Sequence, residues 1–183
     1  MTLKLSTLAM ALGLGLALPQ SFGILNPEKF AASVRRFPRN GFLGVVLMLL
    51  GTTWFILNLN QESIADFNAF KPWMMLGFAA IGVGACVFVQ DFLAVRGLAV
   101  VLLLMGKLML DTGRPLLPVT HWVLVIQTWA YVLIVAGMWF TISPWRLRDL
   151  LNWATENPAR VRIGSAARLA FGLFVAVLGF TKF

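Results

Sequence analysis

The chain contains one kind of segment twice: NPEKFAASVRRFPR at residues 26–39 and SPWRLRDLLNWATENP at residues 143–158. Each begins with a helix-capping residue followed by proline, carries several basic side chains, and ends near a second proline. Long apolar runs precede and follow both segments. This order predicts membrane-spanning helices joined by short amphipathic helices that lie flat at the membrane surface.

The composition indicates a helical membrane protein. Of the 183 residues, 60% are hydrophobic and 12% are charged, and the mean hydropathy is +0.85. Soluble domains have about 45–50% apolar and about 25% charged residues. No stretch is polar and long enough to form a separate soluble domain. We therefore expect an all-α, polytopic fold with a single transmembrane domain over residues 1–183.

Six apolar runs have about the length that a helix needs to cross a bilayer core. They are residues 5–25, 41–59, 72–89, 98–110, 122–142 and 163–180. The first run also has the outline of a signal peptide, but we take it as the first span. The fourth run is short, so the alternative for residues 78–110 is a helical pair that does not cross fully.

The basic residues predict the orientation of the six spans. One side of the membrane receives most of the 15 Lys and Arg side chains, namely Lys29, Arg35, Arg36, Arg39, Arg96, Arg146, Arg148, Arg160, Arg162 and Arg168. The positive-inside rule places that side in the cytoplasm, which predicts a bacterial inner-membrane protein with both termini in the periplasm. We expect the net charge of +8 to meet anionic lipid headgroups and not nucleic acid.

Each surface helix has an apolar stripe at helical spacing. The stripes supply six candidates for contact with the membrane interface: Phe30, Val34, Phe37, Leu147, Leu150 and Leu151. The alternative is that each segment is an ordinary loop helix whose stripe packs on neighbouring parts of the protein.

Few polar side chains fall within the apolar runs, and four are candidate intramembrane polar residues: Lys107, Asp111, Gln127 and Arg168. Lys107 and Asp111 are four residues apart and can pair on one helix face. Either this pair is neutralised near the membrane surface, or it takes part in moving an ion or proton. We expect Arg168 to extend towards the headgroups, and Gln127 to bond a neighbouring helix.

The sequence contains no recognisable catalytic or metal-binding motif. His121 is the only histidine, and beside Trp122 it is typical of an interfacial aromatic belt, with axial ligation of a pigment as the alternative. No Gly-rich phosphate loop or nucleophile elbow is present. Asp91 and Arg96 are expected to pair at the link between the third and fourth spans. We predict no enzyme activity, no catalytic residue, no metal site and no cofactor.

Small residues recur at helical spacing in the first, third and sixth spans. In lipid, helices associate through close packing, and small residues permit it. The candidate helix-docking positions are Gly13, Gly77, Gly84, Gly172 and Gly179. Their partner helices lie either in the same chain or in another subunit.

Residues 5–59 and 122–180 share one outline, which predicts a repeat of two hairpins with residues 72–111 as a middle hairpin. The outline is a span, a proline, a basic amphipathic stretch, a second proline, and a span opened by Arg and Gly. In the second copy it consists of Pro144, Trp145, Pro158, Arg162, Gly164 and Gly172.

On these residues the chain resembles the YjeT-like family of small two-span inner-membrane proteins of unknown function, mainly over residues 144–180 and again over residues 19–59. The resemblance implies no catalytic residues. A second resemblance, to DoxX-type four-helix membrane proteins, rests on Arg168, Leu169, Gly172, Gly179 and Lys182.

These features favour a non-enzymatic integral membrane subunit or scaffold in a larger membrane complex, because helix-docking surface is plentiful and charge within the bilayer is nearly absent. The expected partners are the bilayer, its anionic headgroups, and other membrane subunits or further copies of the chain. One alternative is a small-solute transporter or channel, with Lys107, Asp111 and Gln127 along its path. The other is a membrane-shaping protein whose surface helices wedge into the cytoplasmic leaflet.

Overall fold

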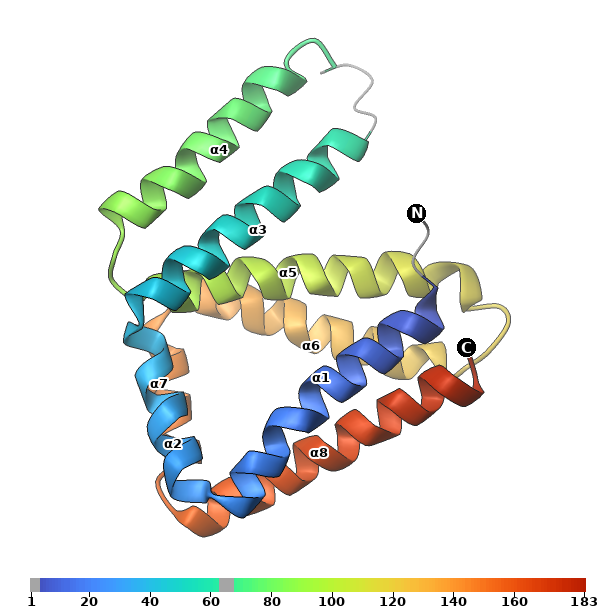
Figure 1. The fold of residues 1–183 in the computed structure, drawn as a ribbon. Helices are drawn as coiled ribbons and strands as arrows, with labels where there is room; N and C mark the ends of the chain where they lie inside the picture. Colours follow the sequence, from blue (N-terminus) through green and yellow to red (C-terminus); the bar gives the residue numbers. More distant parts are fainter. Residues whose placement is uncertain (1–3, 63–67) are drawn as a thin grey trace. The chain divides into compact units, whose positions relative to one another are not determined.

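The computed structural model describes residues 4–62 and 68–183. Within these residues the chain forms eight α-helices and no strand, and six of the helices are long and apolar enough to cross a membrane (Figure 1). The predicted all-α, polytopic fold with six spans is therefore confirmed.

The six long helices are α1 (Leu5–Leu25), α3 (Gly41–Gln61), α4 (Lys71–Phe88), α5 (Leu93–Gly113), α6 (Val123–Ile142) and α8 (Pro158–Thr181). Two helices of ten residues, α2 (Pro27–Arg36) and α7 (Trp145–Ala154), form within the two basic segments. Short 3-10 helices, η1 (Phe37–Arg39) and η3 (Arg114–Leu116), follow α2 and α5. Both outer parts thus have the order long helix, ten-residue helix, long helix, while their origin as a repeat stays a prediction.

The fourth span is longer than predicted. α5 begins at Leu93, five residues before the expected start, and has 21 residues. The preceding turn closes tightly because Phe92 adopts a φ of 55°, which non-glycine residues rarely do. The Phe92 carbonyl then accepts a hydrogen bond from Arg96 N–H at 3.1 Å, which starts the helix. Both helices of the 78–110 region are long enough to cross a bilayer.

The sixth span also starts earlier than predicted. α7 ends at Ala154, and α8 begins at Pro158 instead of residue 163. The cause is a cap that the sequence analysis did not identify: Asn157 Oδ1 accepts a hydrogen bond from Ala159 N–H at 3.0 Å. Proline in the first helical turn loses no hydrogen bond there, so the pair Asn157–Pro158 begins a helix efficiently.

The chain divides into two compact units, which are described separately. The first contains the chain up to Arg36, Met105–Ile134 and Arg148–Phe183. The second contains Phe37–Leu104 and Val135–Leu147. The division passes through α5, α6 and α7, so each of these helices contributes to both units.

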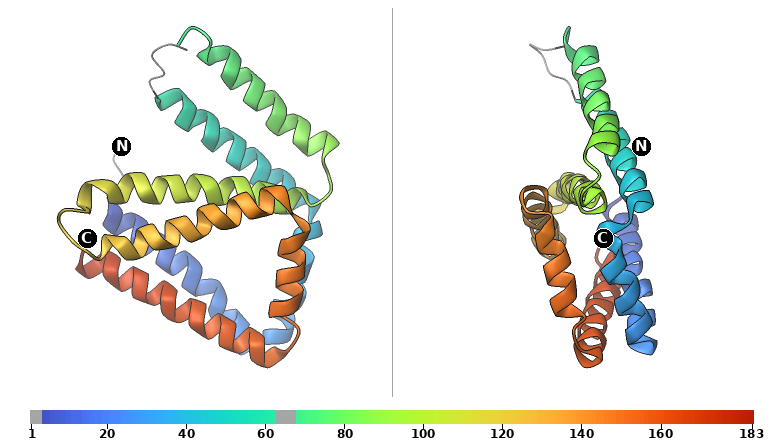
Figure 2. Two further views of the ribbon diagram at one scale, coloured as in Figure 1. Left: turned by 180° about the vertical axis from the view of Figure 1, so that it is seen from behind. Right: turned by 90° about the vertical axis from the view of Figure 1, so that its left-hand side faces the viewer.

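In the first unit, α1 and α8 lie side by side and antiparallel (Figures 1 and 2). Gly13 faces Gly172 and Ala176, and a Cβ atom added at Gly13 would lie 2.5 Å from the Gly172 carbonyl oxygen. Further along, a Cβ added at Gly179 would lie 2.9 Å from the backbone of Met10. The two backbones are therefore in direct contact, and we call this contact the α1–α8 seam.

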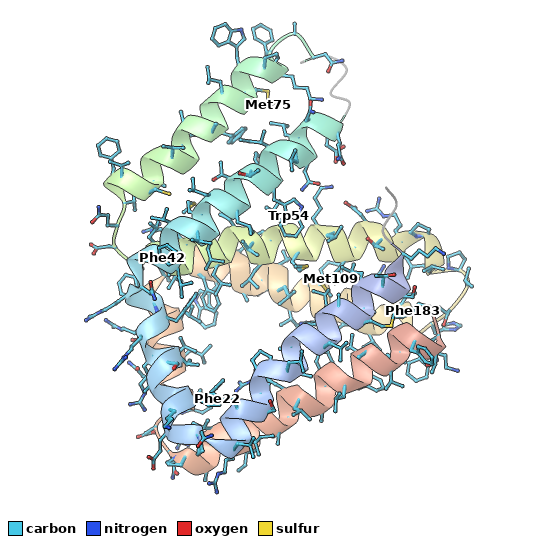
Figure 3. All side chains as sticks on the ribbon, in the orientation of Figure 1. Phe22, Phe42, Trp54, Met75, Met109 and Phe183 are labelled. Carbon is cyan, nitrogen blue, oxygen red and sulfur yellow. The ribbon has the colours of Figure 1, made fainter. Side chains whose placement is uncertain are left out.

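One end of the α1–α8 seam carries the hydrophobic core of the first unit. The end of α5 and the start of α6 pack there, with Met109 (labelled in Figure 3) among the fully buried side chains. The buried members of this core are Leu5, Leu8, Ala9, Met109, Val123, Ile126, Ala130 and Val175. Four helices thus meet at the end of the seam where α1 begins and α8 ends.

In the second unit, α3 packs antiparallel to α4 and parallel to the start of α5. The rings of Phe55 and Phe78 are 4.8 Å apart between α3 and α4. A Cβ atom at Gly44 would lie 2.8 Å from the Ala94 nitrogen, and one at Gly97 would lie 2.7 Å from the Met48 nitrogen. These directions are those expected of consecutive spans that cross a membrane in alternation.

Candidate functional site

The predicted docking glycines fall into two groups. Gly13, Gly172 and Gly179 are buried in the α1–α8 seam, where backbone atoms of the facing helix occupy the space beside them. Gly77 and Gly84 lie on α4, where a Cβ added at Gly77 would meet nothing within 4 Å and one at Gly84 only the ring edge of Phe88. The structure therefore uses one group within the chain and leaves the other without a helix against it.

The face of α4 with these two glycines also carries exposed apolar side chains. We call Gly77, Ala80, Ile81, Gly84 and Phe88 the open face of α4. Within this helix only Gly82 is buried, and it contacts Thr52 of α3. Since Gly82 is five residues from Gly77, it lies about 140° away around the helix. The open face thus points away from α3.

A polar contact crosses the α1–α8 seam. Arg168 Nε donates a hydrogen bond to Gln20 Oε1 at 3.0 Å, and Gln20 is only 8% exposed. The two end nitrogens of the guanidinium lie over Gly164, 3.5 and 3.7 Å from where its Cβ would be. The side chain therefore points back along α8 towards the helix start, as expected for an arginine that extends towards headgroups.

The neighbouring turn of the seam is tightly packed. Ser165 is fully buried, and its hydroxyl lies against Gly23 of α1. Among the described residues this hydroxyl has no hydrogen-bond partner. Only glycine at position 23 leaves room for it.

A second polar contact ties α2 to the turn between α7 and α8. Arg35 donates from Nε to Thr155 Oγ1 and from its terminal nitrogen to the Thr155 carbonyl oxygen, both at 2.7 Å. Thr155 is buried, and its hydroxyl donates to the Leu151 carbonyl oxygen at 2.7 Å. A groove of about 260 Å³ lies beside this contact, with Glu28 and Glu156 on its walls.

The predicted interface residues are mostly packed within the protein. The Phe30 ring lies 6.4 Å from that of Phe22 (labelled in Figure 3), in an edge-to-face arrangement, and Leu147 is buried. Val34, Phe37 and Leu151 are half-buried, whereas Leu150 is 44% exposed. Contact of these six side chains with a membrane interface stays a prediction, but most of their apolar area already has protein neighbours.

The candidate polar residues of α5 and α6 do not come together. Lys107 Nζ and Asp111 Oδ2 form an ion pair of 2.7 Å, and both side chains are nearly half exposed. Gln127 on α6 lies beside Gly113, where an added Cβ would be 3.9 Å from the Gln127 amide nitrogen. Gly113 is two residues from Asp111 and so lies about 200° away around α5. Gln127 therefore faces the opposite side of α5 from the ion pair.

The structure also shows where Asp91, Arg96 and His121 lie. Asp91 and Arg96 form no ion pair in the part of the chain that the structure describes, because the early start of α5 draws Arg96 into the helix and leaves Asp91 in the turn. Arg96 Nε is buried there without a hydrogen-bond partner. His121 is exposed in the turn before α6. Among residues 4–62 and 68–183, no group of three His, Cys, Asp or Glu side chains could hold a metal ion.

Three contact residues were not predicted from the sequence: Gln20, Thr155 and Gly82. Gln20 follows Pro19 inside an apolar run, so a polar residue at that place was the signal for a partner. Thr155 and Gly82 gave no such signal, because a threonine after a helix and a glycine in a span are common. The partner of Thr155 is Arg35, which is 120 residues away in the sequence. The partner of Gly82 is Thr52, which lies on the preceding helix.

Comparison with known proteins gives no relative from which a function could be transferred. No family model, curated protein or solved structure matches the chain. A function can therefore be inferred only from the geometry of this molecule.

Proposed function

We propose that the protein is a non-enzymatic integral membrane subunit or scaffold, and that the open face of α4 receives a membrane-spanning helix of another chain. One observation carries this proposal: a Cβ added at Gly77 or Gly84 would meet no atom of another helix within 4 Å, whereas the seam glycines lie against a packed backbone. The proposal extends to the bacterial inner membrane as its location, with both termini in the periplasm.

The spacing of the two glycines suits a helix-packing groove. Gly77 and Gly84 are seven residues apart, which is two helical turns, so they lie one above the other on one face. Large exposed side chains border the glycines, including Phe88, which is 86% exposed. Small residues between large ones form a depression along the helix, and a ridge of a second helix fits into it.

The chain itself shows what such glycines do. In the α1–α8 seam, glycines at comparable spacing, Gly172 and Gly179, bring two backbones into contact. Lipid tails are as apolar as the protein surface, so exposed apolar side chains by themselves do not favour association. Close backbone packing does, and the glycines of the open face permit it.

The geometry gives less support to the two alternatives. A transport path through Lys107, Asp111 and Gln127 would need these side chains on one side of α5, whereas Gln127 lies on the opposite side from the ion pair. Membrane shaping would need free apolar side chains on α2, whereas Phe30 packs on Phe22.

The test is the mass of the protein isolated with its native lipid from its own membrane. We expect the wild type to purify with further helical membrane chains. The double variant Gly77→Leu and Gly84→Leu fills the groove, so we expect a monomer that is still folded. The matched control is Val83→Leu, which changes an exposed α4 position off the open face and should leave the complex intact.

Two tagged copies expressed together identify the partner. Co-purification of both tags supports a self-assembling scaffold, and co-purification of a different chain supports a subunit of a mixed complex. A wild type that is a lone monomer both in detergent and in lipid would overturn the proposal.

A further inference from the structure

We propose that Arg168 and Gln20 form a binding site for a negatively charged phosphoryl group, which the headgroup of an anionic phospholipid supplies. This site lies in the first unit, so the proposal is independent of the docking role of α4. It goes beyond a general attraction of basic residues to headgroups, because it names one guanidinium and the residue that orients it.

The charge of Arg168 favours an anionic ligand. Arg168 lies within a span, ten residues after the first residue of α8, or about 15 Å along the helix axis. Its one protein partner in the described part of the chain is the neutral amide of Gln20, and no carboxylate there forms an ion pair with it. A guanidinium in a span without a counter-ion is costly, and an anion that approaches it removes part of that cost.

The orientation of the Arg168 guanidinium suits a phosphoryl group. The bond from Nε to the buried Gln20 holds the guanidinium plane in place. Its two terminal nitrogens make no protein hydrogen bond among the described residues, so they present a pair of parallel donors. This fork matches two oxygens of a phosphoryl group, and charge-assisted bonds of this kind are the strongest that an arginine makes.

The position of the guanidinium gives a headgroup access to it. The terminal nitrogens lie over Gly164, one turn nearer the start of α8, which has no side chain to cover them, and Arg168 is an exposed residue. Side chains on a helix lean towards its N-terminus, so the guanidinium lies at a shallower depth than the Arg168 backbone. Arg160 and Arg162 follow directly after the start of α8, which indicates that the helix begins at the level of the headgroups.

The experiment measures binding of short-chain phosphatidylglycerol to the full-length protein in a neutral detergent, by native mass spectrometry. We expect Arg168→Gln to weaken binding by about tenfold or more, since one charge-assisted hydrogen-bond pair is lost. Arg162→Gln is the matched control, because it removes the same charge from the same helix without touching Gln20. Phosphatidylglycerol binding by Arg162→Gln should stay within about twofold of that of the wild type.

Gln20→Glu separates phosphoryl binding from a purely structural contact. A carboxylate at this position would pair with Arg168 and neutralise it, so the seam keeps its contact while the anion loses its site. We expect a thermal unfolding temperature no lower than that of the wild type, together with the same loss of lipid binding as in Arg168→Gln. Gly164→Leu, which covers the terminal nitrogens from outside the seam, should also weaken lipid binding.

Inorganic phosphate, added as a competitor, distinguishes the two sources of the anion. Failure of millimolar phosphate to displace the lipid supports the headgroup as the ligand. Displacement supports the phosphoryl site and assigns it to a free anion as well. Equal phosphatidylglycerol binding by the wild type, Arg168→Gln and Gln20→Glu would overturn the proposal.

Discussion

The α1–α8 seam and the open face of α4 contain the same kind of residue in opposite situations. Gly13, Gly172 and Gly179 lie against backbone atoms of a facing helix, whereas no facing helix lies within 4 Å of a Cβ added at Gly77 or Gly84. In water, an apolar helix face without a partner would be unstable, but in lipid it costs little. The comparison favours the pair of glycines two turns apart on α4, and not the exposed apolar side chains or a single open glycine such as Gly15, as the place that we propose for a further helix.

The largest expected effect comes from filling the seam. In Gly13→Leu the new side chain would start 2.5 Å from a backbone oxygen of α8, and backbone atoms cannot move aside without separating the helices. We expect a loss of about 3 kcal/mol in the free energy of unfolding, at the upper end of overpacking effects. Reversible unfolding in mixed micelles measures it.

The control for this variant lies two residues away in the same helix. Gly15 has no atom within 4 Å of its would-be Cβ, so Gly15→Leu should change the free energy by less than about 0.5 kcal/mol. Equal effects of the two variants would show that the α1–α8 seam is not packed as described.

The second prediction compares two glycines of α4. Gly82 contacts Thr52 of α3, so Gly82→Leu should force α3 and α4 apart and destabilise the protein by about 2 kcal/mol. Gly84→Leu should change the stability of the isolated monomer by less than about 0.5 kcal/mol, because it extends into open space. Thermal unfolding of the monomer in detergent measures both, and the reverse order would place the open face on the wrong side of α4.

The third prediction concerns the contact between Arg35 and Thr155. Thr155→Val removes the hydroxyl that Arg35 Nε donates to, but it leaves the carbonyl oxygen that accepts the second bond. The same hydroxyl donates to the Leu151 carbonyl oxygen, so the variant loses two hydrogen bonds, and we expect a loss of about 1–2 kcal/mol. Thr155→Ser keeps the hydroxyl and should be nearly neutral. Chemical denaturation compares the two variants, and an equally large loss in both would show that the hydroxyl is not the stabilising group.

The smallest expected effect comes from the ion pair of α5. Lys107 and Asp111 are nearly half exposed, and exposed pairs four residues apart contribute about 0.3–0.5 kcal/mol. Lys107→Ala and Asp111→Asn should therefore each change stability by no more than that, and should leave solute flux in liposomes at background. Flux in the wild type that is lost in both variants would instead favour the transport alternative.

The sequence predicted the helices well because apolar runs and prolines are local signals. The first span agrees with α1 at both ends, and both ten-residue helices form where the basic segments predicted them. The starts of α5 and α8 were wrong by five residues, because the φ of Phe92 and the cap at Asn157 depend on turn geometry that hydropathy does not report.

Packing partners were beyond the reach of the sequence. The glycines of α1 predicted close packing, but nothing in the sequence indicated that their partner is the last span, about 160 residues away. Likewise, no pattern distinguished Gly82, which packs on α3, from Gly84, which does not. Such pairings depend on the three-dimensional fit of whole helices, which no local pattern in a single sequence reports.

Photocrosslinking along α4 in native membranes tests the central claim most directly. The photoreactive residue benzoylphenylalanine is introduced singly from residue 76 to residue 88, so that a crosslink requires no matching cysteine on the partner chain. We predict crosslinks to another chain that are strongest at positions 77, 81, 84 and 88 and weakest at position 82. Crosslinks of equal strength around the helix, or none to any other chain, would contradict the claim that this face receives a partner helix.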